Sequence, residues 1–71
     1  MKLSEAKSLK TGDAVYHVTK KNADGSAMRA IVTSVKTWKR LPGRVEVKVK
    51  RGIYEYATFD ENEINQLTMT E

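Results

Sequence analysis

The sequence contains no cysteine, a single histidine and a single proline, and it has no long apolar segment. Without cysteine the chain forms neither a disulfide framework nor a thiolate metal site, and one histidine is too few for a histidine-rich metal site. No apolar run approaches the roughly 18 residues that a membrane-spanning helix needs. The first residues lack the apolar stretch of a signal peptide, which predicts a protein that stays in the cytosol. No metal or cofactor is expected.

Catalytic groups are equally scarce. His17 has no serine or cysteine nucleophile set beside it by the sequence, and we expect it to be an exposed strand residue. The four glycines are spread one per turn, so they do not form a phosphate-binding loop. Asp60, Glu61 and Glu63 form the one acidic cluster, whose spacing fits helix capping better than a calcium loop. The sequence therefore predicts a binding module and no enzyme.

Length and composition indicate one small domain. The 71 residues suffice for a single domain spanning residues 1–71. A domain of this size buries only about 60 % of the surface of its unfolded chain, so its hydrophobic core is thin. Residues 1–10 are mostly polar and form either a short helical turn or a loose N-terminal arm, whereas residues 11–70 are expected to form a β-rich core.

Strand-like segments alternate with turn residues along the chain. Residues 14–20 and 27–38 are rich in β-branched and aromatic side chains, and Asp24-Gly25 between them predicts a hairpin. Both faces of residues 27–38 carry apolar side chains, which is typical of a closed barrel or of a strand that bends between two sheet halves. Residues 44–51 alternate between valines and charged side chains, as a half-buried strand does.

The turn that follows decides which way two tyrosines face. A further strand is expected over residues 53–59, because this segment is again aromatic and β-branched. If Arg51-Gly52 alone forms the turn, Tyr54 and Tyr56 share the inner face with the valines of residues 44–51. A slip of one residue would reverse these faces. The sequence therefore predicts that both tyrosines belong to the core.

The C-terminal part completes the expected fold. Asp60 can cap a short helical turn, with Glu63 reaching back to it, and residues 67–70 can add a short fifth strand. These segments predict a mainly β fold. Its form is either a small five-stranded barrel or a curled antiparallel sheet, with one short helical turn near the C-terminus.

Three short motifs lie within residues 11–36: Gly12-Asp13-Ala14-Val15-Tyr16, Asp24-Gly25 and Arg29-Ala30-Ile31-Val32. In this order they resemble the opening hairpin of Tudor-like and KOW-like barrels. The resemblance implies a five-stranded barrel of the Src-homology-3-like type. KOW-like barrels contact RNA or ribosomal partners, which the resemblance implies here as well.

Two further resemblances concern binding and origin. Tudor-like barrels hold methylated side chains in an aromatic cage, and Tyr16 matches one cage position. Met28 stands where a second aromatic side chain would be expected, so a methyl-lysine or methyl-arginine reader is not expected. The segments Asn22-Ala23-Asp24-Gly25, Lys36-Thr37-Trp38-Lys39 and Lys50-Arg51-Gly52 resemble those of small uncharacterised bacteriophage proteins.

The basic residues are concentrated in the middle of the chain. The net charges of residues 1–35, 36–51 and 52–71 are +3, +6 and −5. Cations along an extended strand can follow a phosphate backbone, and an exposed aromatic ring can stack on a base. We therefore predict that nucleic acid, DNA or RNA, or another partner binds through this basic segment. Its residues are Lys36, Trp38, Lys39, Arg40, Arg44, Lys48, Lys50 and Arg51.

Alternatives remain open for the same residues. The cations can form a solvated outer face that keeps an edge strand from aggregating, and Glu46 and Glu55 dilute their charge. Trp38 is either a stacking platform or protein-binding anchor, or a large side chain that closes one end of the core.

The function predicted from the sequence is that of a small basic binding module. It would act as an accessory or regulatory factor on nucleic acid or a nucleoprotein complex, and the bacteriophage resemblance implies that it is phage-encoded. The alternative is a protein-interaction module, monomeric or dimeric, that binds an acidic host protein or itself. The membrane is not expected to be a partner.

Overall fold

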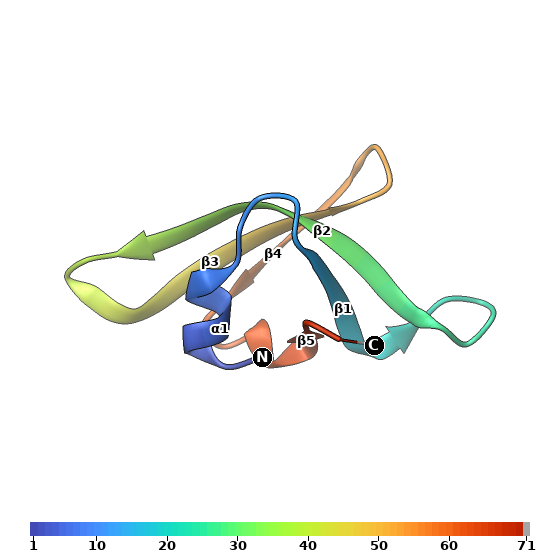
Figure 1. The fold of residues 1–71 in the computed structure, drawn as a ribbon, viewed down its shortest axis with the longest axis horizontal. Helices are drawn as coiled ribbons and strands as arrows, with labels where there is room; N and C mark the ends of the chain where they lie inside the picture. Colours follow the sequence, from blue (N-terminus) through green and yellow to red (C-terminus); the bar gives the residue numbers. More distant parts are fainter. Residues whose placement is uncertain (71) are drawn as a thin grey trace.

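A computed structural model describes residues 1–70 as a curled five-stranded sheet that arches over a short helix (Figure 1). The elements follow in the order α1 (Leu3–Ser8), β1 (Ala14–Lys21), β2 (Ala27–Trp38), β3 (Leu41–Arg51), β4 (Glu55–Asp60), the 3-10 turn η1 (Ile64–Gln66) and β5 (Leu67–Thr68). The strand order is β4-β3-β2-β1-β5, and every pairing is antiparallel.

The mainly β prediction is confirmed, and the curled sheet is the form that the chain adopts. β4 and β5 are the two edges of the sheet and do not pair with each other, so the sheet is not closed into a barrel. β5 supplies the expected fifth strand, although it spans only Leu67–Thr68. Within residues 1–70, the helices are all too short and too polar to cross a membrane.

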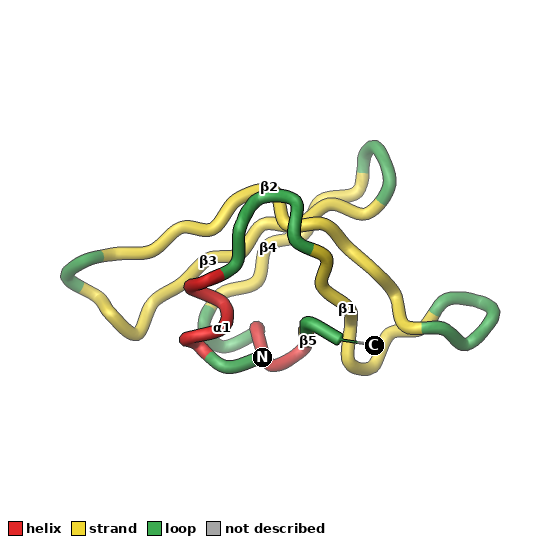
Figure 2. The backbone as a smooth tube through the Cα atoms, in the orientation of Figure 1, coloured by secondary structure: helices red, strands yellow, loops and turns green. Residues whose placement is uncertain are grey.

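The hydrophobic core lies on the inner side of the sheet. α1 and η1 both lie beneath the arch, where they cover the apolar face of the strands (Figure 2). The core combines the alternating valines of β3 with apolar residues from every other element: Ala6, Leu9, Val15, Ala30, Val32, Val45, Val47, Val49, Phe59, Ile64 and Leu67. Burying this apolar surface supplies most of the driving force for folding.

The N-terminal residues belong to this core. The Ala6 side chain is fully buried and Leu9 is 5 % exposed, so α1 packs on the sheet through its apolar side. The amino group of Met1 donates hydrogen bonds to the carbonyl oxygens of Ile64 at 3.0 Å and Leu67 at 2.7 Å. The predicted short helical turn is therefore correct, and the loose-arm alternative is wrong.

A β-bulge explains why both faces of β2 look apolar in the sequence. The pairing of β2 with β3 shifts by one residue between Val32 and Ser34, which leaves Thr33 as the extra residue. The Thr33 hydroxyl donates a hydrogen bond to the carbonyl oxygen of Lys48 at 3.0 Å. Because the bulge resets the alternation, Val32 and Val35 both point toward the core. Neither a closed barrel nor a change of sheet is needed.

The turn between β3 and β4 is longer than the sequence suggested. Arg51 pairs with Glu55, so the three residues 52–54 form the turn, with Gly52 at a φ of +72°. This backbone conformation favours glycine because a β-carbon would crowd the following carbonyl oxygen. Relative to a two-residue turn, every β3–β4 pair moves by three residues. A shift by an odd number exchanges the two faces of β4.

The predicted core position of the two tyrosines is therefore wrong. Tyr54 is 88 % exposed and Tyr56 is 58 % exposed. Phe59, opposite Val47, is the aromatic residue that β4 contributes to the core, and it is 6 % exposed. The consequence is that β4 presents an aromatic side chain to solvent beside the cations of β3.

Two other turns have the geometry that the sequence predicts. Gly25 has a φ of +88°, and the carboxylate of Asp24 accepts hydrogen bonds from the backbone and hydroxyl of Ser26. These hydrogen bonds lower the pKa of Asp24. After β4, the Asp60 N–H donates to the Glu63 carboxylate at 3.3 Å, as expected, but in a turn that precedes η1, whose own N-cap, Glu63, makes no side-chain capping hydrogen bond.

Candidate nucleic-acid interface on the outer sheet face

The outer face of the sheet is the side opposite α1 and η1, and in residues 1–70 no helix covers it (Figure 1). Alternation along β3 assigns side chains to this face. Val45, Val47 and Val49 point inward, so their neighbours point outward. Arg44, Lys48 and Lys50 are accordingly exposed. Because the valines of β3 alternate with charged residues, the cations of this strand form a row on the outer face.

Trp38 lies at the end of β2 between two cations of the same face. The Lys36 ammonium lies 5.2 Å from the centroid of its ring, and the Arg44 guanidinium lies 4.3 Å from it. Both distances are within the range of a cation–π interaction. Trp38 is half-buried but lies outside the core cluster. Trp38 therefore does not close one end of the core, and the partners that cover its ring include surface cations.

Tyr56 is a second aromatic residue on the outer face, and the sequence reasoning missed it. It lies opposite Lys50 in the β3–β4 pairing, and the Lys48 ammonium is 5.4 Å from the centroid of its ring. Its position follows from the three-residue turn. The signal in the sequence was Phe59, because a register that buries this fully apolar side chain has to expose Tyr56, three residues away on the same strand.

The remaining predicted site residues fall into two groups. Lys39 and Arg40 form the turn between β2 and β3, where both are exposed at the tip of the projecting hairpin. Arg51 lies on the inner side, because it follows the inward-facing Val49 by two residues. Its guanidinium forms an ion pair with Glu55 at 2.5 Å and contacts the sulfur of Met28. The structure therefore separates Arg51 from the other seven predicted residues.

The acidic side chains reach the outer face mainly at one place. Glu46 of β3 lies directly opposite Lys36 of β2 and Asp60 of β4, so it reduces the positive charge there. Glu55 is engaged by Arg51 on the inner side and does not dilute the outer face. One of the five acidic residues that give residues 52–71 their net charge of −5 is Glu71, which lies outside the described residues.

A cleft lies on the inner side, between β1, β3 and the free edge of β4. Its volume is about 340 Å³, and its lining includes His17, Lys20, Arg51 and Phe59 together with both Tyr54 and Tyr56. His17 is only 9 % exposed, so its predicted surface position is wrong. Within residues 1–70, no group of three or more histidine and carboxylate residues is placed to hold a metal ion.

The environment of His17 shifts its titration. Its ring meets that of Phe59 edge-on, with centroids 5.7 Å apart and an angle of 61° between the planes. Burial lowers the pKa of His17, and the positive charges of Lys20 and Arg51 lower it further. The imidazole is therefore neutral at pH 7, where it packs as a core aromatic group.

Comparison of the chain with protein-family models, with curated proteins and with solved structures gives no match. The Tudor-like and KOW-like resemblance accordingly remains a prediction. The geometry of the outer face and of the cleft is what bears on function.

Proposed function

We propose that the chain binds single-stranded nucleic acid on its outer sheet face. The observation that carries this proposal is the pairing of rings with cations on an uncovered face. Trp38 lies between Lys36 and Arg44, and Tyr56 lies beside Lys48. The two rings come from β2 and β4, on either side of β3, so they offer two separate stacking surfaces with a row of cations between them.

The chemistry of this face suits an unpaired strand better than a duplex. Flat aromatic rings stack on exposed bases of any sequence, and cations along the same path neutralise the phosphates. In a duplex the bases are already stacked on one another, so the rings would contribute less. Lys39 and Arg40 extend the basic path to the tip of the β2–β3 hairpin.

In this proposal the protein is an accessory or regulatory factor, consistent with its small size. The resemblance to KOW-like barrels and to small bacteriophage proteins points in the same direction. No catalytic step is part of the proposal.

The experiment is a titration of the protein with short single- and double-stranded DNA and RNA, followed by fluorescence. Trp38 is the only tryptophan, so a change in its emission reports on the proposed site. We expect saturable binding that favours single strands and weakens with salt. The outer face and the hairpin tip together carry six cations, so the slope of log K against log salt for a single strand should be roughly −4 if each neutralises one phosphate.

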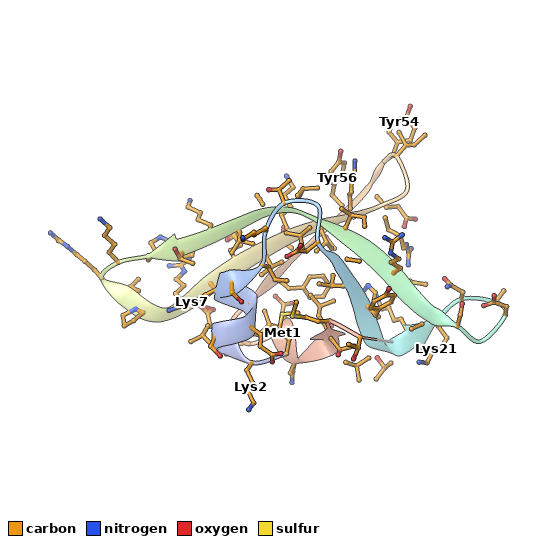
Figure 3. The ribbon with its side chains drawn as sticks, viewed as in Figure 1. Met1, Lys2, Lys7, Lys21, Tyr54 and Tyr56 are labelled. Atoms are coloured by element: carbon orange, nitrogen blue, oxygen red, sulfur yellow. The ribbon has the colours of Figure 1, made fainter. Side chains whose placement is uncertain are left out.

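Matched charge variants locate the binding site. Lys36→Glu with Lys48→Glu removes two cations from the outer face, whereas Lys2→Glu with Lys21→Glu changes the net charge equally at positions away from it (Figure 3). We expect the first pair to abolish measurable binding and the second pair to weaken it only slightly. Equal losses from both pairs would show that net charge alone governs binding, and the proposed site would then be wrong.

A further inference from the structure

The free edge of β4 lacks several of the features that usually protect an edge strand, although it carries the charged side chains of Glu55 and Asp60. In the described part of the chain, β4 pairs with β3 on one side and with no strand on the other. Its pairing with β3 runs from Glu55 to Asp60 without a bulge, and the strand contains neither proline nor lysine. Natural sheets normally protect such an edge with these devices. The opposite edge, β5, spans only Leu67–Thr68 and offers little backbone to pair with.

The cleft runs beside this edge. Val49, Ala57 and Phe59 supply apolar lining from β3 and β4, and His17 lines it from β1. An extended segment placed there would lie next to β4, at the position where a further strand could close the sheet toward β1. The volume of about 340 Å³ suits a short stretch of chain or a small ligand.

The rim of the cleft is positively charged. Lys20 and Arg51 both line it, and only Glu55, which pairs with Arg51, opposes them. Burial lowers the pKa of His17, and the charges of Lys20 and Arg51 lower it further. Both cations therefore act on the interior of the cleft. A carboxylate entering beside Lys20 would complement this charge.

Exposed apolar side chains flank the same edge. Ile53 is 77 % exposed and Tyr54 is 88 % exposed, and both belong to the turn that leads into β4. Exposed aromatic and aliphatic side chains next to a groove are typical of protein-binding surfaces. Tyr54 stands out from the body of the molecule at this turn (Figure 3).

We propose that β4 and the adjoining cleft bind an extended, acidic segment of a partner protein, which adds to the sheet as a further strand. Its backbone would pair with the free edge of β4. One apolar side chain would contact Phe59, and an acidic side chain would lie near Lys20. Strand addition of this kind obtains its affinity from backbone hydrogen bonds and its specificity from alternate side chains. The site lies on the inner side of the sheet and shares only Tyr56 with the outer-face site, so it does not depend on nucleic-acid binding.

The test uses three end-blocked synthetic peptides with the unmodified protein. One alternates valine with glutamate, the second has lysine in place of glutamate, and the third is the first with alternate backbone nitrogens methylated. Binding is measured by calorimetry, and the contact site by the backbone amide NMR signals of isotope-labelled protein. We expect the acidic peptide to shift the signals of Ala57, Phe59 and His17. The lysine peptide should bind about tenfold more weakly because like charges meet at the rim.

The methylated peptide separates strand addition from simple charge attraction. It keeps both the carboxylates and the valines but cannot form the ladder, so we expect its binding to be lost. Lys20→Glu should weaken the acidic peptide about fivefold, since a surface charge pair contributes at most about 1 kcal/mol. Lys21→Glu, next in the sequence and exposed but not part of the cleft, should leave its affinity unchanged.

Three results would overturn the proposal. They are no binding of the acidic peptide at millimolar concentration, equal binding of the methylated peptide, and self-association of the free protein through β4. Light scattering on the free protein detects the last result, which would make a second copy the occupant of this edge.

Discussion

At the scale of single residues, Phe59 and Tyr56 show how one strand serves both the core and the surface. Phe59 is 6 % exposed and meets the ring of His17 edge-on at the inner side of the sheet, whereas Tyr56 is 58 % exposed. Residue type gave only one indication of their positions, the more apolar ring of Phe59, because both residues are aromatic and both favour strands. The length of the preceding turn decides between them. Trp38 was similarly ambiguous from the sequence, because the cations that cover it come from two different strands.

Substitution of Phe59 should destabilise the fold strongly, whereas substitution of Tyr56 should hardly change its stability. Phe59→Ala removes a buried ring and should lower the free energy of unfolding by about 3–5 kcal/mol. In a domain this small, such a loss is enough to leave a large share of the molecules unfolded. Tyr56→Ala removes an exposed ring and should change it by no more than about 0.5 kcal/mol. Urea denaturation followed by Trp38 fluorescence measures both. A larger loss from Tyr56→Ala would restore the core position that the sequence suggested for the tyrosines.

His17 should make stability depend on pH. Its pKa is lowered in the folded protein, so below pH 6.5 the unfolded chain binds a proton that the folded chain resists. The contribution of neutral His17 to stability should therefore be fully present above about pH 6.5 and should decline as the pH falls toward the lower pKa of the folded state. Urea midpoints at about pH 7.5 and 5.5 measure the decline. His17→Gln should flatten the pH dependence of the urea midpoint over this interval. An unchanged pH profile in this variant would show that His17 is not its cause.

At the scale of elements, the regular strands were predictable from the sequence and the irregularities were not. β3 could be recognised from its alternating valines, and the β1–β2 turn from Asp24-Gly25. The bulge at Thr33 adds one residue to β2 without any distinctive residue type, so its effect on the sequence was an apparent loss of alternation. The hydrogen bond between Asp60 and Glu63 was readable because both residues lie within one turn, although the helical turn η1 begins only after Glu63.

The turn between β3 and β4 can be tested through its glycine. Gly52 has a φ of +72°, and no atom lies within 4 Å of the position that a β-carbon would occupy there. Substitution is therefore opposed by backbone conformation and not by crowding. Gly52→Ala should lower the free energy of unfolding by about 1–2 kcal/mol.

Gly43→Ala is the matched control, because Gly43 is equally open and its φ is outside the left-handed region. It should change stability by no more than about 0.5 kcal/mol. Equal effects of the two substitutions in urea denaturation would count against the three-residue turn.

At the scale of the whole molecule, the curled sheet divides the surface into two sides with different chemistry. The outer face carries rings and cations, and the inner side carries the core, the cleft and Arg51. The segregation of basic residues into 36–51 was visible in the sequence, and seven of the eight predicted site residues lie on the outer face or at its hairpin tip. Arg51 and Tyr56 could not be placed, because the side on which each lies depends on pairing between strands.

This division has a consequence for the assembly of larger complexes. An outer face that binds a nucleic-acid strand leaves the β4 edge and the cleft free for a protein segment. A chain of 71 residues could in this way connect the two kinds of partner, and each proposal can be tested without the other.

The most direct measurement of the central claim is the affinity of two tyrosine variants for a single-stranded oligonucleotide. Tyr56 lies beside Lys48 on the outer face, whereas Tyr54 is more exposed and belongs to the turn before β4, and both also border the cleft. Tyr56→Ala should lose about 1–3 kcal/mol of binding free energy, the contribution of one stacked base, and Tyr54→Ala should bind as the unmodified protein does. Equal affinities for both variants, or a loss confined to Tyr54→Ala, would contradict binding on the outer face.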